Sequence, residues 1–175
     1  MICFRTAVAF EAASISLLVN SAYRGDSSRK GWTTEADFLD GQRTDEASIL
    51  ELISDPSAQI ELAYDSDHPA VILGSVYLNF AVPNTLYFGM LTVEPGLQTK
   101  GIGKQLLSHL EIKAREKMCQ RIRMTVIRGR DELIAFYERR GYQATGKTEP
   151  FPMHDPRFGI PKKTLEFLEF IKTLT

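Results

Sequence analysis

A glycine-containing turn between an apolar stretch and a helical pattern holds the residues whose types best suit chemistry. Glycines let a backbone approach a ligand, and the unsatisfied N–H groups of a first helical turn, with the helix dipole, stabilise negative charge. Lys100 and Lys104 add two cations. The turn therefore predicts a pyrophosphate-binding loop, although the P-loop and GxGxxG motifs are absent and a glycine pair alone would also suit a helix-capping turn. The segment is Leu91-Thr92-Val93-Glu94-Pro95-Gly96-Leu97-Gln98-Thr99-Lys100-Gly101-Ile102-Gly103-Lys104.

Two motifs, separated by one helix and one strand, carry a family resemblance. The pattern Val-x-Pro-x-x-Gln-x-x-Gly-x-Gly resembles the acetyl-coenzyme A signature of the GNAT N-acetyltransferase family, and it is formed by Val93, Pro95, Gln98, Gly101 and Gly103. Downstream, the run Ala135-Phe136-Tyr137-Glu138-Arg139-Arg140-Gly141-Tyr142 resembles that family's second hallmark, a helix that bears Phe-Tyr and closes on Gly and an aromatic residue. The motifs cover about residues 86–147, and the rest of the chain matches only in the order of its elements.

The resemblance implies where acetyl-coenzyme A binds. A mixed sheet, splayed like a V between the strand ending at Val93 and the strand ending near Ile127, would hold the pantetheine arm. The backbone of Leu91 to Val93 would pair with that arm, and the backbone of Gln98 to Lys104 would bind the pyrophosphate. The residues expected at the cofactor are Leu91, Thr92, Val93, Gln98, Thr99, Lys100, Gly101, Ile102, Gly103, Lys104, Arg130 and Phe136.

Acetyl transfer to an amine needs a neutral amine, stabilisation of an oxyanion and a proton for the departing thiolate. Tyr137 matches the family tyrosine near the cofactor sulfur and would supply that proton; the alternative is a core tyrosine. A backbone N–H near Leu91 or Thr92, left free by the splay, would stabilise the oxyanion. The resemblance breaks down at the base, because Gly89 and Met90 stand where many relatives carry an acidic residue.

The base is therefore left open. Glu94 lies beside the turn and need not face the cleft, and His109 is expected to be a surface or packing residue on the following helix. Water that relays the proton to bulk, or to an N-terminal carboxylate, serves as well. Arg130 is a second departure, since relatives often place an asparagine there; it would either reach a phosphate or be an exposed charge.

In the family, N-terminal helices and their loop usually build the acceptor pocket. The candidate acceptor-binding residues are Tyr23, Arg24, Trp32, Glu35 and Arg43. Arg24 and Arg43 suggest an acceptor with a carboxylate, whereas Glu35 suggests a cationic amine, and an amino acid or peptide terminus would carry both groups. Trp32, the only tryptophan, lies in a polar loop and fits either a binding surface or a cap on the core.

The elements that must position these residues follow from periodicity. A short strand at Ile2–Thr6 precedes a helix over Ala9–Tyr23, whose spaced apolar residues include Phe10 and Leu17. Gly25–Gly31 predicts a loop, Thr33 or Thr34 predicts the start of a short helix through Leu39, and Asp45–Ile53 predicts another.

From residue 59 the pattern changes to strands. Three of them form an antiparallel meander ending at Val93, followed by a helix through Ala114, a strand around Met124 and a helix over Asp131–Arg140. Strands at Tyr142–Lys147 and Leu165–Lys172 flank a proline-rich loop, Pro150–Pro161. This order predicts an α+β fold with a mixed, mostly antiparallel sheet, and residues 1–175 are expected to form a single GNAT domain.

Composition excludes several classes of protein. The net charge of -1 argues against a general nucleic-acid binder, although residues 98–147 carry a net +7 and suit an anionic ligand; a solvated charged face is the alternative. No run has the roughly 18 to 20 apolar residues of a membrane span. Cys3 and Cys119 lie far apart without metal-ligand spacing, so we expect free thiols, no metal and a cytoplasmic protein. A homodimer is compatible with the sequence, which does not determine the oligomeric state.

The sequence thus predicts an N-acetyltransferase that moves an acetyl group from acetyl-coenzyme A to a primary amine of a small molecule, amino acid or peptide by direct attack. Two alternatives stand beside it. A catalytically silent coenzyme A-binding regulatory module would explain the missing strand carboxylate, and Tyr137 argues against it. An enzyme for a different acyl donor would need more room beside Met90 and Phe136.

Overall fold

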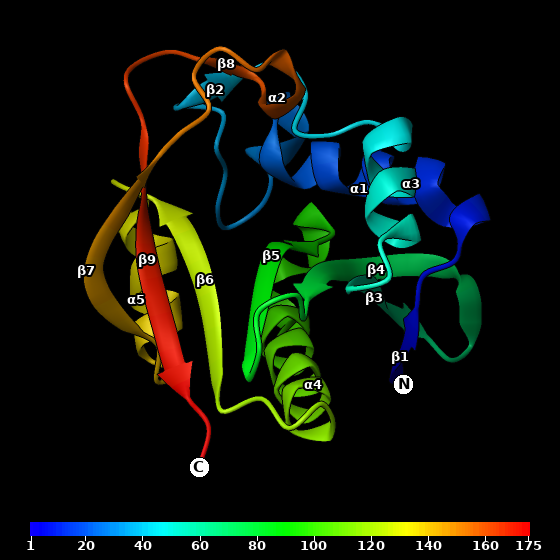
Figure 1. Ribbon diagram of the computed structural model, residues 1–175. Helices are drawn as coiled ribbons and strands as arrows, with labels where there is room; N and C mark the ends of the chain where they lie inside the picture. Colours follow the sequence, from blue (N-terminus) through cyan, green and yellow to red (C-terminus); the bar gives the residue numbers. More distant parts are fainter.

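The computed structural model describes residues 1–175 and contains a seven-stranded sheet in the order β1-β3-β4-β5-β6-β9-β7. All neighbouring strands are antiparallel except β5 and β6, which are parallel. The α+β fold with a mostly antiparallel sheet is therefore confirmed (Figure 1). The strands are β1 (Ile2–Thr6), β3 (Ala58–Asp65), β4 (His68–Asn79), β5 (Thr85–Val93), β6 (Arg121–Ile127), β7 (Gln143–Pro150) and β9 (Glu166–Thr173). A separate pair joins β2 (Leu39–Asp40) to β8 (Ile160–Pro161).

Helices cover both faces of the sheet (Figure 1). On β3, Ile60 and Leu62 pack against the first and third helices, whereas Ala63 belongs to the larger core around the fourth helix, as strand alternation requires. The helices are α1 (Ala12–Tyr23), α2 (Gly25–Ser28), α3 (Glu46–Ser54), α4 (Ile102–Glu116) and α5 (Asp131–Glu138), with 3-10 turns at Ala9–Glu11, Pro95–Lys100 and Pro156–Phe158. None of these helices combines the length and the hydropathy of a membrane span.

The sheet divides at β5 and β6. Their parallel pairing covers only Thr85–Tyr87 against Arg121–Arg123, after which the two strands diverge, as Figure 1 shows. A bulge on β5 reinforces the break: the register against β4 shifts between Ser75 and Tyr77, and Met90 adopts a positive φ of 48°. The expected V-shaped splay is thus confirmed, and the edge of β5 beyond Tyr87 has no strand partner on that side.

The segment that follows α1 differs from the sequence expectations in two respects. A helix through Leu39 was wrong: Thr34 Oγ1 accepts a hydrogen bond from Ala36 N, but the turn ends at once and Leu39 pairs with β8. The predicted loop after Tyr23 contains the short helix α2.

The helix over Ala9–Tyr23 is confirmed with its first turn in 3-10 geometry. Its apolar face was predicted from Phe10, Ala13, Leu17 and Leu18; Leu18 is buried, but the prediction was wrong for Phe10 and Leu17. Phe10 and Leu17 are 87% and 71% exposed. The face against the sheet consists of Ala12, Ile15, Val19 and their neighbours, because small and β-branched side chains let α1 lie close to α3, β4 and β5.

Candidate active site

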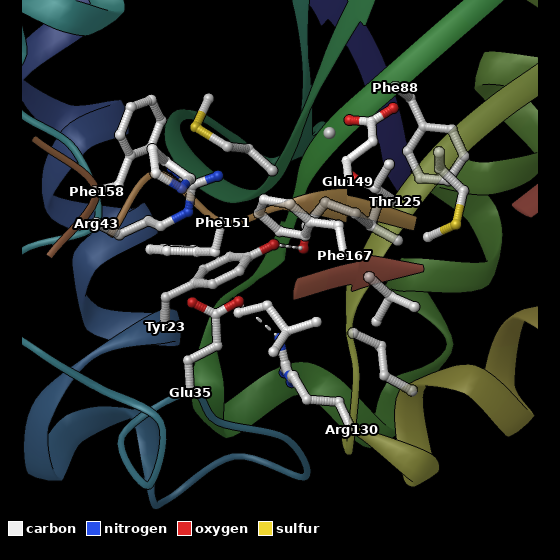
Figure 2. A pocket seen from close by; sticks show the side chains of 18 of the residues that line it. Tyr23, Glu35, Arg43, Phe88, Thr125, Arg130, Glu149, Phe151, Phe158 and Phe167 are labelled. Atoms are coloured by element: carbon white, nitrogen blue, oxygen red, sulfur yellow. Dashed lines mark hydrogen bonds and ion pairs between the residues drawn. The ribbon is translucent and has the colours of Figure 1, made fainter. Parts of the chain in front are cut away.

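Two adjoining cavities occupy the wedge between β5 and β6. The larger has a volume of about 370 Å³ and the smaller about 60 Å³. Leu91, Leu133 and Tyr137 line both, so the two cavities meet at these residues, and we call the pair the cleft. Figure 2 shows the larger cavity, into which residues from α1, the loop before α3, β5, β6 and the C-terminal strands project.

The smaller cavity lies at the glycine loop. Gln98 and Gly103 line it together with Val93, Trp32 and Phe136. Gly101 caps α4 with a left-handed φ of 82°, and a side chain there would meet nothing within 4 Å, so the backbone of the turn faces open space. Thr99, Lys100 and Lys104 are exposed, whereas the Ile102 side chain is buried in the core and leaves only its backbone available. The segment therefore fits the predicted contact with a pyrophosphate through main-chain groups.

The Gln98 side chain has a structural task that the sequence did not indicate. Its Oε1 accepts hydrogen bonds from the backbone N–H groups of Trp32 and Thr33, at 2.7 and 3.2 Å. The Trp32 ring lies 5.7 Å from that of Phe136 on α5. The loop before Glu35 thus spans both walls of the cleft, and Trp32, which is 43% exposed, lines its smaller end.

Tyr137 is both a core residue and a cleft residue. It is 4% exposed, and its ring packs against those of Phe88, Phe136 and Tyr142 at centroid distances of 5.3 to 5.9 Å. No group of the chain hydrogen-bonds its hydroxyl, and burial raises the pKa of this phenol well above its usual value. Tyr137 is therefore a neutral O–H donor at the junction of the cavities, and its catalytic role stays a prediction.

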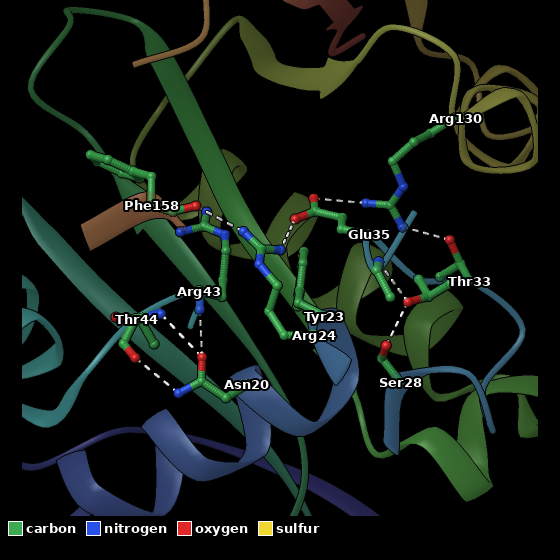
Figure 3. A network of polar contacts seen from close by, with 12 residues as sticks. Asn20, Tyr23, Arg24, Ser28, Thr33, Glu35, Arg43, Thr44, Arg130 and Phe158 are labelled. Carbon is green, nitrogen blue, oxygen red and sulfur yellow. Dashed lines mark hydrogen bonds and ion pairs between the residues drawn. The ribbon is translucent and has the colours of Figure 1, made fainter. Parts of the chain in front are cut away.

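A buried chain of charges lies beside the larger cavity (Figure 3). Glu35 accepts hydrogen bonds from Arg24 and from Arg130, the latter at 2.9 Å, and all three side chains are at most 8% exposed. Arg130 Nη2 also donates to Thr33 Oγ1 at 2.6 Å, and Arg24 Nη2 donates to the Phe158 carbonyl at 2.9 Å.

These pairings change the interpretation of two predicted site residues. Arg24 and Glu35 neutralise one another, so neither is free to attract a charged acceptor, as the sequence alone had suggested. Arg130 is not an exposed charge; its contact with a cofactor phosphate stays a prediction and would require its present bonds to break. Both arginines therefore connect the N-terminal loop to α5 and to the C-terminal segment.

Tyr23 and Arg43 are predicted acceptor-binding residues that do line the larger cavity. Tyr23 donates its hydroxyl to the Leu91 carbonyl at 2.9 Å, and burial raises its pKa. The Arg43 guanidinium lies 5.6 Å from the centre of the Tyr23 ring. The Leu91 carbonyl, which was expected to pair with the pantetheine arm, therefore already accepts a hydrogen bond from the protein. The free N–H group expected near Leu91 or Thr92 stays a prediction.

Neither Glu94 nor His109 lines either cavity of the cleft. His109 is a packing residue, one of the two roles expected for it: its ring stacks on Phe4, and its Nε2 lies 2.5 Å from Glu61. Glu149 on β7 does line the larger cavity but pairs with Arg123. The two carboxylates of the cavity, Glu35 and Glu149, are both held by arginines.

Sequence reasoning missed the C-terminal contribution to the pocket. Phe151, Phe158 and Phe167 form much of its apolar wall, although only the N-terminal helices were expected to build it (Figure 2). The sequence did contain a signal for this contribution: three phenylalanines lie in or near the proline-rich loop. Since loops are usually polar, such apolar residues indicate that the segment packs against another part of the protein.

Comparison with known proteins places this geometry among acetyltransferases. The model of the Acetyltransferase (GNAT) family matches residues 26–142. The uncharacterized protein YdhI of Bacillus subtilis (strain 168) is 39% identical over 54 residues, which are 31% of this chain and 34% of that protein. The chain thus matches about a third of the length of that relative.

Solved structures match almost the whole chain at low identity. A proposed phosphinothricin N-acetyltransferase is 13% identical with a TM-score of 0.73, covering 100% of this chain and 99% of that one. The protein yncA of Salmonella typhimurium, solved with its cofactor acetyl-CoA, is 18% identical with a TM-score of 0.67, covering 99% and 94%. The ribosomal-protein-alanine N-acetyltransferase of Brucella melitensis is 18% identical with a TM-score of 0.68, covering 98% and 99%. These likenesses show a shared fold.

Proposed function

Since this chain belongs to the GNAT acetyltransferase family and is therefore an acetyl-CoA-dependent acyltransferase, we propose that it acetylates a primary amine of a small molecule, amino acid or peptide by direct attack. The observation that carries the proposal is the pair of adjoining cavities. The narrow one lies at the glycine loop, the wide one has an aromatic wall, and Tyr137 lines both. The names of two similar structures, a proposed phosphinothricin N-acetyltransferase and a ribosomal-protein-alanine N-acetyltransferase, support an amine as the acceptor.

The residues of the narrow end suit coenzyme A. Backbone N–H groups of Gln98 to Lys104 would hold the pyrophosphate, with Lys100 and Lys104 adding positive charge. The unpaired edge of β5 beyond Tyr87 would hydrogen-bond the pantetheine amides. When bound, acetyl-CoA supplies an activated thioester carbonyl.

In the proposed reaction the acceptor nitrogen bonds to the acetyl carbon and the carbon–sulfur bond breaks, so the sulfur leaves as a thiolate that needs a proton. Tyr137 donates it, since its raised pKa keeps the phenol protonated and its hydroxyl has no other partner. An N–H on the free edge of β5 stabilises the charge that develops on the carbonyl oxygen. Neither Cys3 nor Cys119 lines the cavities, which favours direct attack over transfer through a cysteine.

The attacking amine must be neutral. Because both carboxylates of the cavity are paired with arginine, we propose that the amine loses its proton to water rather than to a dedicated side chain. The acceptor's own pKa then sets the pH dependence of the reaction.

A panel of amines, each mixed with acetyl-CoA and the protein, tests this function by the release of free coenzyme A. We expect release with at least one class of primary amine. Thermal stabilisation by acetyl-CoA without turnover of any acceptor would instead support a silent regulatory module, and turnover only with longer acyl-CoA donors would support a different acyl transferase.

A further inference from the structure

We infer that the acceptor is a small α-amino acid with an apolar side chain, and that Arg43 binds its carboxylate. This inference rests on the proposed function and specifies the acceptor that the wide end of the cleft takes. It follows from four observations: the pairing of charges in the cavity wall, the fixed backbone of Arg43, its contact with Tyr23, and the apolar surface beside it.

Of the three arginines that line the larger cavity, Arg43 alone has no carboxylate partner. Arg24 and Arg130 share Glu35, and Arg130 also lies 3.7 Å from Glu132. Arg43 has no carboxylate within 4 Å, and its guanidinium makes no hydrogen bond within the chain, although it is half-buried and lines the cavity. A guanidinium that lines the cavity without a partner in the chain is available to an anionic group of a ligand, and a hydrogen bond between two charged groups is among the stronger ones.

The backbone of Arg43 is held in place. Asn20 Oδ1 accepts hydrogen bonds from Arg43 N and Thr44 N at 2.7 and 3.2 Å, and Asn20 Nδ2 donates to the Thr44 carbonyl at 2.9 Å (Figure 3). The guanidinium meanwhile lies over the Tyr23 ring. Arg43 is thus presented to the cavity on a fixed segment, which lowers the entropy cost of binding an anion.

Tyr23 connects Arg43 to the reacting end of the cleft. The Arg43 guanidinium lies 5.6 Å from the centre of the Tyr23 ring, and the Tyr23 hydroxyl donates to the Leu91 carbonyl. A compact acceptor that carries its anion and its amine close together suits this arrangement, whereas a diamine would place a second cation beside Arg43.

The wall around Arg43 is apolar. Phe151, Phe158, Phe167 and Met90 line it, and Figure 2 shows Phe158 and Phe151 next to the Arg43 side chain. The volume of about 370 Å³ is near the lower end of the roughly 300–1,000 Å³ of ligand pockets, and a single amino acid suits it better than a large acceptor. An apolar side chain would remove these aromatic surfaces from water.

The test compares leucine, leucinamide and isoamylamine as acceptors, which share the side chain and differ in the carboxylate. Because the pKa of the amine also differs among them, kcat/KM is expressed per concentration of neutral amine, and we expect the value for leucine to exceed that for the other two at least about 10-fold. Arg43→Met should raise KM for leucine about 10- to 100-fold with little change in kcat, because the variant loses the hydrogen bond between two charged groups, the guanidinium and the carboxylate. The KM for leucinamide should not change, because leucinamide has no carboxylate for Arg43 to bind. Arg43→Lys should restore part of the preference.

Binding of N-acetyl-leucine to the protein without cofactor, measured by calorimetry, gives a readout apart from turnover, and Arg43→Met should abolish it. Arg115→Met is the matched control, because Arg115 is exposed on α4 outside both cavities. Equal turnover of leucine and leucinamide, or an unchanged leucine KM in Arg43→Met, overturns the inference while leaving the N-acetyltransferase in place. Absence of turnover with every primary amine overturns the proposed function and the inference with it.

Discussion

Replacing Glu35 by glutamine tests whether the buried arginine–glutamate chain is structural. The change leaves Arg24 and Arg130, which are 5% and 4% exposed, without the carboxylate between them. Removing one partner of a buried ion pair typically costs about 3–5 kcal/mol, and glutamine, which keeps the shape and one acceptor, should cost about 3 kcal/mol. At about 2–4 °C per kcal/mol for a chain of this length, the midpoint of thermal unfolding should fall by about 6–12 °C.

Urea unfolding followed by circular dichroism measures this loss, with an unchanged m-value showing that the native state stays compact. Glu132→Gln is the matched control: Glu132 is 3.7 Å from Arg130 but 39% exposed, so its loss should cost less than about 1 kcal/mol. A Glu35→Gln variant within 1 kcal/mol of the wild type would refute the reasoning. If that variant were stable but had a raised acceptor KM, Glu35 would bind the acceptor.

Three further predictions concern the cleft. Tyr137→Phe should lower kcat about 10²–10⁴-fold with little change in stability, since no group of the chain bonds its hydroxyl; an unchanged kcat would contradict its role as the acid. Gly101→Glu should weaken acetyl-CoA binding at least about 10-fold by calorimetry. Gly146→Glu is the control and should not weaken it, because Gly146 has a similar positive φ and equally open surroundings; equal acetyl-CoA affinities of the two variants would refute the loop assignment. The value of kcat/KM should rise through about pH 6–9, because the acceptor amine loses its proton over this range. It should not fall again within this range, because burial raises the pKa of Tyr137 and keeps the proposed acid protonated; a fall above about pH 8 would count against this role.

The loop and the hallmark helix could be predicted because their information is local. Gly101, at the left-handed position that caps α4, and the Val93-to-Gly103 spacing are features of one contiguous segment. Strand periodicity likewise predicted the meander of β3, β4 and β5. The divergence of β5 from β6 was predicted from the resemblance to the GNAT family. These features need no knowledge of which distant segment lies opposite.

The acceptor site could not be derived in the same way, because its charges pair across the chain. Glu35 and Arg130 are 95 residues apart in sequence and meet only in the folded protein. Arg24, Glu35 and Arg43 are equivalent candidates in the sequence, and only the folded structure pairs the first two. The exposure of Phe10 and Leu17 has a similar origin: helical spacing identifies a face, but the packing partner decides which face is buried.

The fate of the acetyl group tests the central claim most directly. Acetyl-CoA labelled with carbon-13 at the carbonyl, incubated with the protein and an acceptor and followed by NMR, should transfer its label to an amide carbonyl of the acceptor. No labelled protein should accumulate when the acceptor is left out. Label that remains in the thioester, or appears only in acetate, in an ester or on the protein, would contradict direct transfer to an amine.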